Sequence, residues 1–349
     1  MNTIFPANEE NKQIELTTDL TVHYIDAGQA DATLFQYKHE DTYYHILYDA
    51  GDWNKNDVVT YLQNQQIELI DLVIISHPHA DHIGQLPGIM EAFDVGEVWM
   101  SGNTVESGVF INSLEAVTES DTDYYEPRAG EAFQIGPMEI EVLHPTELTG
   151  GLNEDSISVR FTYGEISFLF TGDAYKKQEL MMIDNNKTVK ANFLHLGHHG
   201  SNTSTSPDFL KVVDPEVAIY SAGQDNSYGH PHMEVIQQIH EAGIILYGTD
   251  MDGTIIVSTD GKEYAIDTIE TKANVNKKPE TKPKEEICID INQASPKQLQ
   301  EIIHIGEGRA EAIIESRPYK SLDELMKING ISEGRLKDIE EQGLACVGG

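Results

Sequence analysis

The sequence predicts an α/β fold, in which two sheets pack together with helices on the outside, followed by a small all-α domain. Strand-like and helix-like segments alternate through the first 269 residues, and runs such as 72–75 and 168–170 are continuously apolar, as expected for strands buried on both faces. The composition then changes over residues 270–286, which contain five lysines and two prolines. We therefore predict a large domain over residues 1–269, a linker over 270–286 and a small domain over 287–349.

The elements expected in the large domain follow from local composition and periodicity. The expected strands cover Leu20–Asp26, Tyr43–Asp49, Leu72–Ser76, Glu97–Ser101, Ile140–His144, Ser156–Tyr163, Ile166–Thr171, Phe193–Leu196, Val217–Ser221, Ile244–Gly248 and Thr254–Ser258. The expected helices cover Asp57–Gln65, Gln85–Phe93, Lys176–Asp184, Ser206–Val213 and Met233–Ala242. Histidines and aspartates follow the ends of several of these strands, where α/β proteins place their ligand sites.

The net charge is strongly negative and unevenly distributed. Of the formal charge of −36, residues 1–269 carry −33, because they hold 44 acidic and 11 basic residues; the linker carries +1 and the small domain −4. A domain this acidic repels nucleic acids and anionic membranes unless a local site overrides its field. The chain contains no apolar run of about 18 residues, so we predict no membrane span.

The terminus and the cysteines bear on where the protein works. The N-terminus lacks the basic start and apolar segment of a signal peptide, which by itself predicts a cytoplasmic chain. The only cysteines, Cys288 and Cys346, lie near the two ends of the small domain and form either a disulfide or two unrelated buried thiols. A disulfide would indicate an oxidising compartment. Together with the lysine–proline linker, it favours a secreted or cell-surface protein whose signal peptide has been removed.

The segment His77–His82, with the pattern His-x-His-x-Asp-His, predicts a metal centre. A tight loop cannot direct three imidazoles and a carboxylate at one ion with good tetrahedral geometry. We therefore expect two neighbouring ions, one bound by His77 and His79 and the other by Asp81 and His82. These ligands suit zinc best, with manganese as an alternative, and disfavour calcium and magnesium.

Three residues farther along the chain are candidates to complete the two ions. His144 follows an expected strand and would complete the first ion, whereas His230 lies in a later loop and would complete the second. Asp173 ends another strand and has two carboxylate oxygens, so it would bridge both ions.

Six short motifs in this order resemble the metallo-β-lactamase domain of bacterial competence DNA-uptake channels of the ComEC type, over residues 20–260. The motifs are Asp26–Ala32, Tyr48–Asp52, Ser76–Gly84, Leu169–Asp173, Gly197–Ser201 and Tyr228–Pro231. One departure is Ala30, where that family usually has glycine. Two-zinc phosphorylcholine esterases share the same layout. The resemblance implies a metallo-β-lactamase αβ/βα sandwich and supports His144, Asp173 and His230 as metal ligands.

The resemblance also implies a catalytic histidine that binds no metal, in the pair His198-His199. His199, or else His198, would donate a hydrogen bond to the phosphate or protonate the leaving group, while Asp81 would orient the attacking water as well as bind metal. We favour His199, because the turn that follows it would present its ring to the open side. Asp31 and Asp49 either orient ligand imidazoles or are ordinary turn carboxylates.

Residues 287–349 resemble the tandem helix-hairpin-helix domain of ComEA-type competence DNA receptors. In that fold, glycine-rich hairpins present backbone N–H groups at helix N-termini, where they bind DNA phosphates without reading the base sequence. His304 and Ser332 depart from the usual Gly-hydrophobic-Gly pattern, and Glu307 and Glu333 lie close to where phosphate would approach. The DNA-binding candidates are Gly306, Gly308, Arg309, Gly330, Gly334, Arg335 and Lys337.

These features predict a two-metal hydrolase that cleaves phosphodiesters, with DNA as the leading substrate and weak, salt-sensitive DNA binding. One alternative is a phosphodiesterase acting on small or cell-wall phosphodiesters such as phosphorylcholine, since the acidic domain favours a neutral or cationic substrate. Another is a non-catalytic DNA- or protein-binding module, although binding alone needs no open two-metal centre. The resemblance disfavours lactam hydrolysis, and nothing in the sequence indicates an obligate protein partner.

Overall fold

The computed structural model describes residues 19–184, 188–269, 289–300, 302–328, 330–342 and 344–347. The chain divides into two compact units, Met1–Val275 and Asn276–Gly349. This division falls within the predicted linker, 270–286, which lies outside the described residues, so the predicted domain boundaries remain predictions.

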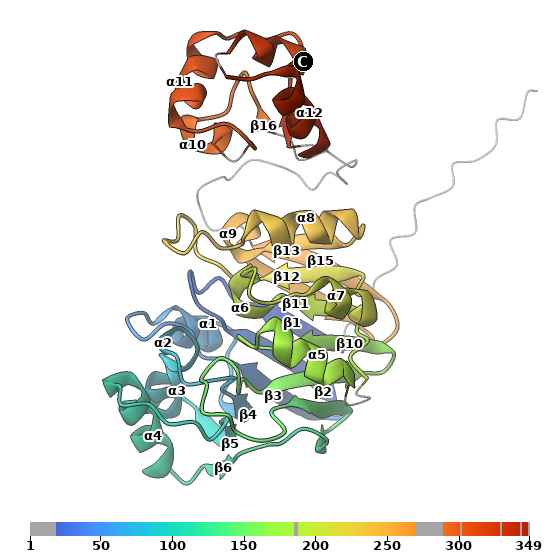
Figure 1. Ribbon diagram of the computed structural model, residues 1–349. Helices are drawn as coiled ribbons and strands as arrows, with labels where there is room; N and C mark the ends of the chain where they lie inside the picture. The colour runs from blue at the N-terminus through green and yellow to red at the C-terminus, as the bar shows by residue number, and fades with distance from the viewer. Residues whose placement is uncertain are drawn as a thin grey trace, which may run out of the picture. The chain divides into compact units, whose positions relative to one another are not determined.

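The first unit contains an eight-stranded mixed sheet in the order β15-β14-β1-β2-β3-β4-β5-β6 (Figure 1). Its strands are β1 (Leu20–Tyr24), β2 (Thr33–His39), β3 (Thr42–Tyr48), β4 (Leu69–Ile74), β5 (Asp94–Trp99), β6 (Asp123–Tyr125), β14 (Thr254–Thr259) and β15 (Tyr264–Ile269). Strands β3 to β6 pair in parallel, so the loops that follow β3, β4 and β5 leave the sheet at one edge.

A seven-stranded sheet in the order β13-β12-β11-β10-β9-β8-β7 packs against the first. Its strands are β7 (Ala132–Ile135), β8 (Met138–His144), β9 (Ser158–Tyr163), β10 (Ile166–Phe170), β11 (Phe193–His195), β12 (Val217–Tyr220) and β13 (Ile245–Gly248). Strands β10 to β13 are parallel, and the loops after β10, β11 and β12 carry Asp173, the His198-His199 pair and His230.

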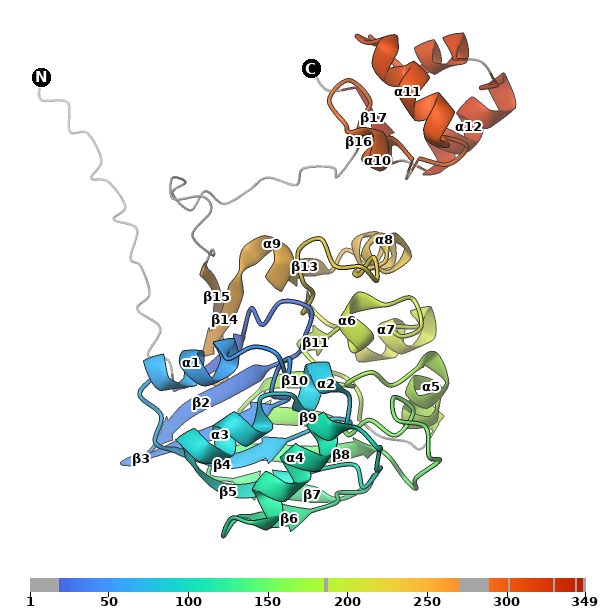
Figure 2. The same cartoon turned by 90° about the vertical axis from the view of Figure 1, so that its left-hand side faces the viewer.

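Helices cover the outer face of each sheet, which gives the order of layers visible in Figure 2. Those on the first sheet are α1 (Asp57–Asn64), α2 (Ala80–Ile83), α3 (Leu86–Ala92) and α4 (Gly108–Thr118). Those on the second are α5 (Lys176–Asp184), α6 (Gly197–Gly200), α7 (Pro207–Val213) and α8 (Met233–Glu241), and a short helix, α9 (Thr249–Asp252), precedes β14. The sequence prediction of an α/β sandwich is confirmed.

The continuously apolar strands have the double burial that the sequence predicts. In β4, Leu72 belongs to the core between the two sheets, whereas Val73 belongs to the core beneath the helices of the first sheet. In β10, Phe168 and Leu169 divide in the same way between the central core and the helices of the second sheet. Burial on both faces removes the polar alternation that would otherwise mark a strand.

The sequence prediction missed several elements, including β2 and α4. Helix α4 begins with Gly-Val-Phe-Ile, a run of weak helix formers. It forms because Ser107 caps its first turn by accepting a hydrogen bond from the Phe110 amide, and because Phe110 and Val117 are buried against the first sheet.

The second unit is small and almost entirely helical, as predicted. It contains α10 (Pro296–Leu299), α11 (Glu307–Glu315), a 3₁₀ helix η1 (Leu322–Lys327) and α12 (Glu333–Gln342). Two short parallel strands, β16 (Ile289–Asp290) and β17 (Ala345–Cys346), bring the two ends of the unit together. Cys346 is disulfide-bonded, in agreement with the first of the two alternatives that the sequence left open, whereas Cys288 lies outside the described residues. Among the described residues, no helix is both long and apolar enough to cross a membrane.

Candidate metal centre

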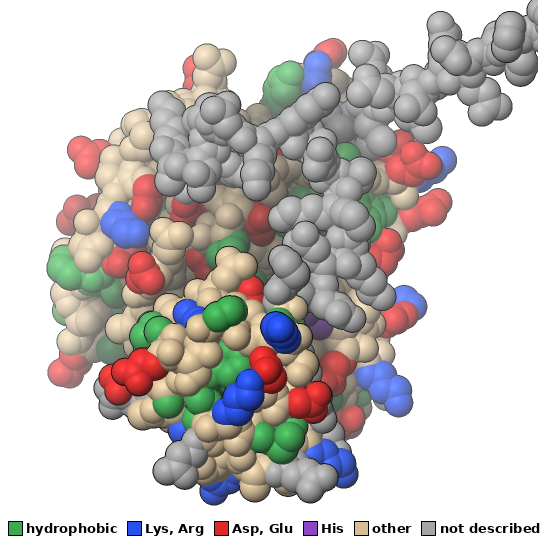
Figure 3. Space-filling view, turned by 90° about the horizontal axis from the view of Figure 1, so that it is seen from above, with side chains coloured by type: hydrophobic (Ala, Val, Ile, Leu, Met, Phe, Trp, Pro, Cys, Tyr) green, Lys and Arg blue, Asp and Glu red, His purple; other side chains and the backbone are tan. Residues whose placement is uncertain are grey.

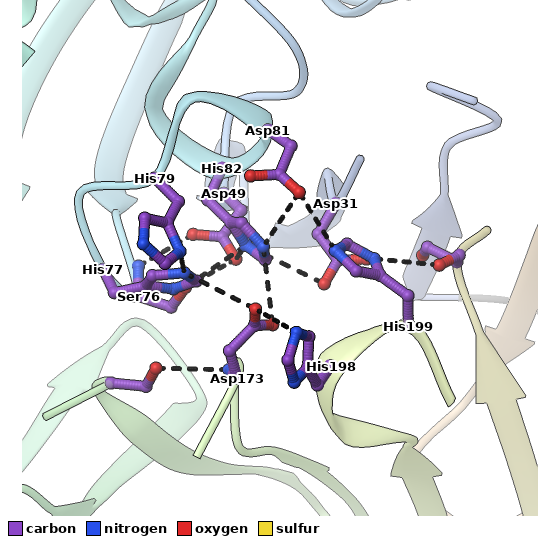
Figure 4. A network of polar contacts seen from close by, with 12 residues as sticks. Asp31, Asp49, Ser76, His77, His79, Asp81, His82, Asp173, His198 and His199 are labelled. Carbon is purple, nitrogen blue, oxygen red and sulfur yellow. Dashed lines mark hydrogen bonds and ion pairs between the residues drawn. The ribbon is translucent and has the colours of Figure 1, made fainter. Parts of the chain in front are cut away.

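The loop after β4 and the turn after β10 bring one group of metal-binding side chains together (Figure 4). His77 Nε2 lies 2.9 Å from His79 Nδ1 and 3.6 Å from Asp173 Oδ2. The ligand atoms of these three residues all lie within 4.8 Å of one another, which is the spacing expected around a single ion. This group corresponds to the first predicted ion.

A second group lies on the other side of Asp173. His82 Nε2 is 3.4 Å from Asp173 Oδ1 and 4.0 Å from Asp81 Oδ2, and His199 Nε2 is 3.3 Å from the same Asp81 oxygen. Asp31, His82, Asp173 and His199 also form a group with ligand atoms within 4.8 Å of one another. Asp173 directs Oδ2 toward His77 and Oδ1 toward His82, and its predicted role as a bridge between two ions remains a prediction.

Several polar atoms in this centre form no hydrogen bonds with one another and are arranged as ligands of a metal ion would be. His82 Nε2, His199 Nε2 and Asp173 Oδ1 are buried and have no hydrogen-bond partner among the described residues. Leaving such atoms unpaired costs about 1–3 kcal/mol each, so proteins rarely do so without a reason. Imidazole nitrogens and carboxylate oxygens that converge in this way are suited to divalent ions such as zinc or manganese.

The electrostatics of the centre reflect acidic groups crowded around buried imidazoles. Burial by itself would lower the pKa of His82, but Asp173, Asp49 and Asp81 outweigh it and raise that pKa to about 10. Burial raises the pKa of Asp173 to about 6, against the attraction of His82 and His199. The charges therefore favour a cation at this position, whether a proton or a metal ion.

Hydrogen bonds on the far side of each ring direct Nε2 into the centre. Asp49 Oδ2 lies 2.8 Å from His82 Nδ1, and its other oxygen accepts from the Ser76 amide. His199 Nδ1 donates to the Ser221 carbonyl at 3.0 Å and lies 3.5 Å from Asp31 Oδ1. Asp49 therefore holds the His82 ring in place, which is one of the two roles that the sequence allowed. Asp31 belongs to the second group of ligand atoms, and both of its carboxylate oxygens are buried without a hydrogen-bond partner among the described residues.

The two histidines of helix α6 have different surroundings, and the geometry separates their roles. Both have left-handed backbone conformations, with φ of 54° at His198 and 55° at His199. Such strain in non-glycine residues is concentrated at functional sites. His199 is buried with its Nε2 among the ligand atoms, whereas the His198 side chain is 22% exposed, with its Nε2 3.4 Å from Asp173 Oδ2. This placement differs from the sequence prediction, which favoured His199 as the catalytic group.

His144 and His230 are not brought into either group of ligand atoms. Nε2 of His144 donates instead to the Glu154 carbonyl at 2.7 Å, because an irregularity in β8 between Val142 and His144 shifts the pairing with β9. A bulge of this kind changes the direction of the side chains that follow it. The His230 ring is stacked with the Tyr228 ring and lines the cleft that leads to the centre. The imidazole beside Asp81 is that of His199, whereas the sequence analysis expected His230 there.

An open cleft of about 350 Å³ gives access to the centre. Its walls include Gln29, His79, Ala80, Asp81, Asn153, Asp173, His198, His199, Tyr228 and His230. Asn153 was not among the residues predicted from the sequence, because asparagine in a loop has no pattern that separates a ligand from a turn residue. Tyr228 is 67% exposed, so its ring is available to a substrate.

In the second unit, the predicted DNA-binding residues lie at two equivalent hairpins. Arg309 Nη1 donates to the His304 carbonyl, and Arg335 Nη1 donates to the Gly330 carbonyl, each at 2.6 Å and each five residues back along the chain. His304 and Gly330 also share a left-handed backbone, with φ of 67° and 89°. The hairpin therefore needs this conformation, which explains why glycine is usual where His304 stands.

The glycines at these hairpins leave the backbone accessible. Gly306 caps α11, and Gly308 and Gly334 lie in the first turns of α11 and α12. All three are exposed, with open space where a side chain would be, and Lys337 is exposed on α12. In Figure 3, Lys and Arg side chains are interspersed with Asp and Glu side chains. This surface is less favourable for DNA than a continuous basic patch.

Comparison with known proteins agrees with both resemblances predicted from the sequence. Residues 25–224 match the model of the metallo-beta-lactamase superfamily, and residues 284–342 match that of a helix-hairpin-helix motif. ComE operon protein 3 of Bacillus subtilis is 28% identical over 256 residues, which are 69% of this chain and 33% of that protein. Competence protein ComA of Neisseria gonorrhoeae is 29% identical over 237 residues, which are 66% of this chain and 31% of that protein.

A shorter match joins the chain to a named nuclease. A deoxyribonuclease of a Thioalkalivibrio strain is 48% identical over 60 residues, 17% of each protein. This chain spans about a third of the length of the two competence-related proteins, and less of the nuclease.

Proposed function

The chain belongs to the metallo-beta-lactamase superfamily, whose fold is that of metal-dependent hydrolases, and we propose that it hydrolyses phosphodiester bonds in DNA. One observation carries the proposal: two groups of ligand atoms, from residues that are buried except for the half-buried His79, share Asp173 at an open cleft. A pair of sites joined by one carboxylate suits in-line displacement at phosphorus, where the attacking and leaving oxygens both need stabilisation.

The ligands of the two ions are assigned from geometry. His77, His79 and Asp173 would hold the first ion. Asp31, His82, His199 and again Asp173 would hold the second, and Asp81, which lies beside His82 and His199, is a further candidate ligand there. When bound, a pair of divalent ions supplies Lewis-acid activation of a water molecule and of a phosphate oxygen.

His198 is the residue that we assign to proton transfer. Burial lowers the pKa of its imidazole to about 3, so the ring is neutral at pH 7 and can hold or move a proton at Nε2. Its Nδ1 lies 2.9 Å from Thr203 Oγ1, which fixes the ring with Nε2 next to Asp173 and open to the cleft.

DNA is the proposed substrate because the hydrolase domain shares its chain with a helix-hairpin-helix motif. Such hairpins bind duplex backbones through exposed amides at helix N-termini. The names of the relatives agree with a role in DNA metabolism, since one is a competence protein and another a deoxyribonuclease. The acidic surface predicts weak binding that requires metal, and contacts of Arg309, Arg335 and Lys337 with phosphates predict that the binding decreases with salt.

Nuclease assays with a ligand variant and a matched control test the proposal. We expect chelation to abolish cleavage of linear, circular and single-stranded DNA, and manganese or zinc to restore it. Asp81→Ala should eliminate activity, whereas Asp260→Ala, which removes an exposed turn carboxylate far along the chain, should not. If metal-loaded protein leaves all three DNA substrates intact, DNA is not the substrate.

A second candidate substrate is a phosphodiester with a cationic group such as phosphorylcholine. The exposed ring of Tyr228 beside the cleft supports it, since aromatic faces bind quaternary ammonium groups. Turnover of p-nitrophenyl phosphorylcholine well above that of bis-p-nitrophenyl phosphate would favour this substrate. Metal analysis showing less than one ion per chain would instead support a non-catalytic binding module.

A further inference from the structure

We propose that the side-chain oxygen of Asn153 is a ligand of the first metal ion and biases that site toward manganese over zinc. This inference rests on the metal centre of the proposed function and concerns the composition of that centre. Asn153 is 6% exposed and lines the same cleft as His79, Asp173 and His198. Its Oδ1 atom is buried and has no hydrogen-bond partner in the part of the chain that the structure describes.

The loop that carries Asn153 is anchored on both sides. Asp155 accepts hydrogen bonds from the amides of Thr149 and Gly150. His144 fixes the neighbouring Glu154 carbonyl from β8. These hydrogen bonds fix the backbone on both sides of Asn153 and so hold its unpaired amide oxygen in one position. Ligand atoms need such support, because they must be held within about 0.5 Å of the productive geometry. His144, predicted as a ligand, acts here as a positioning residue.

The chemistry of the ligand set gives the metal preference. Two imidazole nitrogens and one Asp173 oxygen would supply three ligands of the four-coordinate site that zinc favours. An added neutral oxygen ligand expands the coordination and makes the site richer in oxygen, which suits manganese. Replacing Asn153 with histidine would restore a nitrogen-rich set and favour zinc.

Metal binding to the full-length chain tests the inference independently of catalysis. Equilibrium dialysis against manganese, and separately against zinc, followed by metal analysis gives the number and affinity of bound ions. In Asn153→Ala, we expect one of two manganese sites to weaken by about 10–100-fold, with a smaller change for zinc. Asn153→Asp should keep both manganese sites, and Asn153→His should shift the preference toward zinc.

The control is Asn192→Ala, which removes an asparagine whose side chain pairs with Ser167 between β10 and β11. It should bind both metals as the unmodified protein does. The inference about Asn153 would be overturned, and the two-metal proposal left standing, by either of two results. One is two manganese sites of unchanged affinity in Asn153→Ala, and the other is an equal loss of manganese affinity in Asn153→Ala and Asn153→Asp. Fewer than two manganese sites in the unmodified protein would overturn the two-metal proposal with this inference.

Discussion

Two sets of buried polar side chains in the large unit differ in how their hydrogen bonds are satisfied. Away from the cleft, the buried Glu179 carboxylate accepts from the amides of Thr205 and Ser206, and His23 pairs with Tyr61 and Thr21. At the cleft, buried atoms of His82, Asn153, Asp173 and His199 have no partner among the described residues. The first set contributes to the stability of the fold. The second set lowers that stability in the metal-free protein, and metal binding offsets the loss.

The largest expected effect comes from the bridging carboxylate. Asp173→Asn should reduce phosphodiester hydrolysis by at least ~10³-fold, because one oxygen at each ion position loses its charge. Thermal unfolding of the metal-free variant should show no loss of stability, since burial and the nearby Asp31 and Asp81 already disfavour the Asp173 charge. If the metal-free variant unfolds at a much lower temperature than the unmodified protein, Asp173 belongs to the first set and the comparison between the two sets fails.

Glu179 should show the opposite behaviour. In Glu179→Ala, two buried backbone amides lose their acceptor, and each such loss costs about 1–3 kcal/mol, so we expect a total decrease of roughly 3 kcal/mol in the free energy of unfolding. Chemical denaturation measures this decrease. Metal stoichiometry at a temperature where the variant remains folded is the control, and it should not change; a lost ion would mean that the two sets are coupled.

His23 tests whether a satisfied histidine behaves as a structural one. Burial lowers its pKa from 6.5 to about 4, so the folded protein keeps it neutral while the unfolded chain takes up a proton as the pH falls below 6.5. Stability should therefore decrease between pH 6.5 and 4, by about 1.4 kcal/mol per pH unit, and the His23 contribution is absent above pH 6.5. Between pH 7 and pH 4.5, the free energy of unfolding should decrease by about 2 kcal/mol less in His23→Gln than in the unmodified protein, as measured by chemical denaturation at the two pH values. Equal sensitivity in the two proteins would mean that His23 titrates normally.

The same contrast explains how much of the site could be predicted from the sequence. His77, His79, Asp81 and His82 lie within six residues, so their meeting at one strand end follows from local geometry. Asp173 lies in the turn after β10, a buried strand of the facing sheet, and the packing of the two sheets brings it to the same place.

The remaining site residues depend on side-chain direction, which sequence spacing does not encode. The irregularity near the end of β8 turns His144 toward the Glu154 carbonyl. The left-handed backbone at His198 and His199 decides which of the two rings enters the centre. Asn153 reaches the cleft through a loop whose path is fixed by Asp155, a contact between residues that no periodicity connects to the metal motif.

The smallest expected effect concerns Tyr228, which lies at the cleft but belongs to neither set. Its exposed ring stacks on His230 with 5.7 Å between ring centroids, and it offers a face on which a nucleobase can stack. Stacking of one base contributes about 1–3 kcal/mol, and the lower end of that range suits a ring as exposed as Tyr228. Tyr228→Ala should therefore raise KM for single-stranded DNA about 5–10-fold and leave kcat unchanged. Tyr43→Ala, which removes another exposed tyrosine from the start of β3, is the matched control. A decrease in kcat with constant KM would instead assign Tyr228 to the support of His230 and the metal centre.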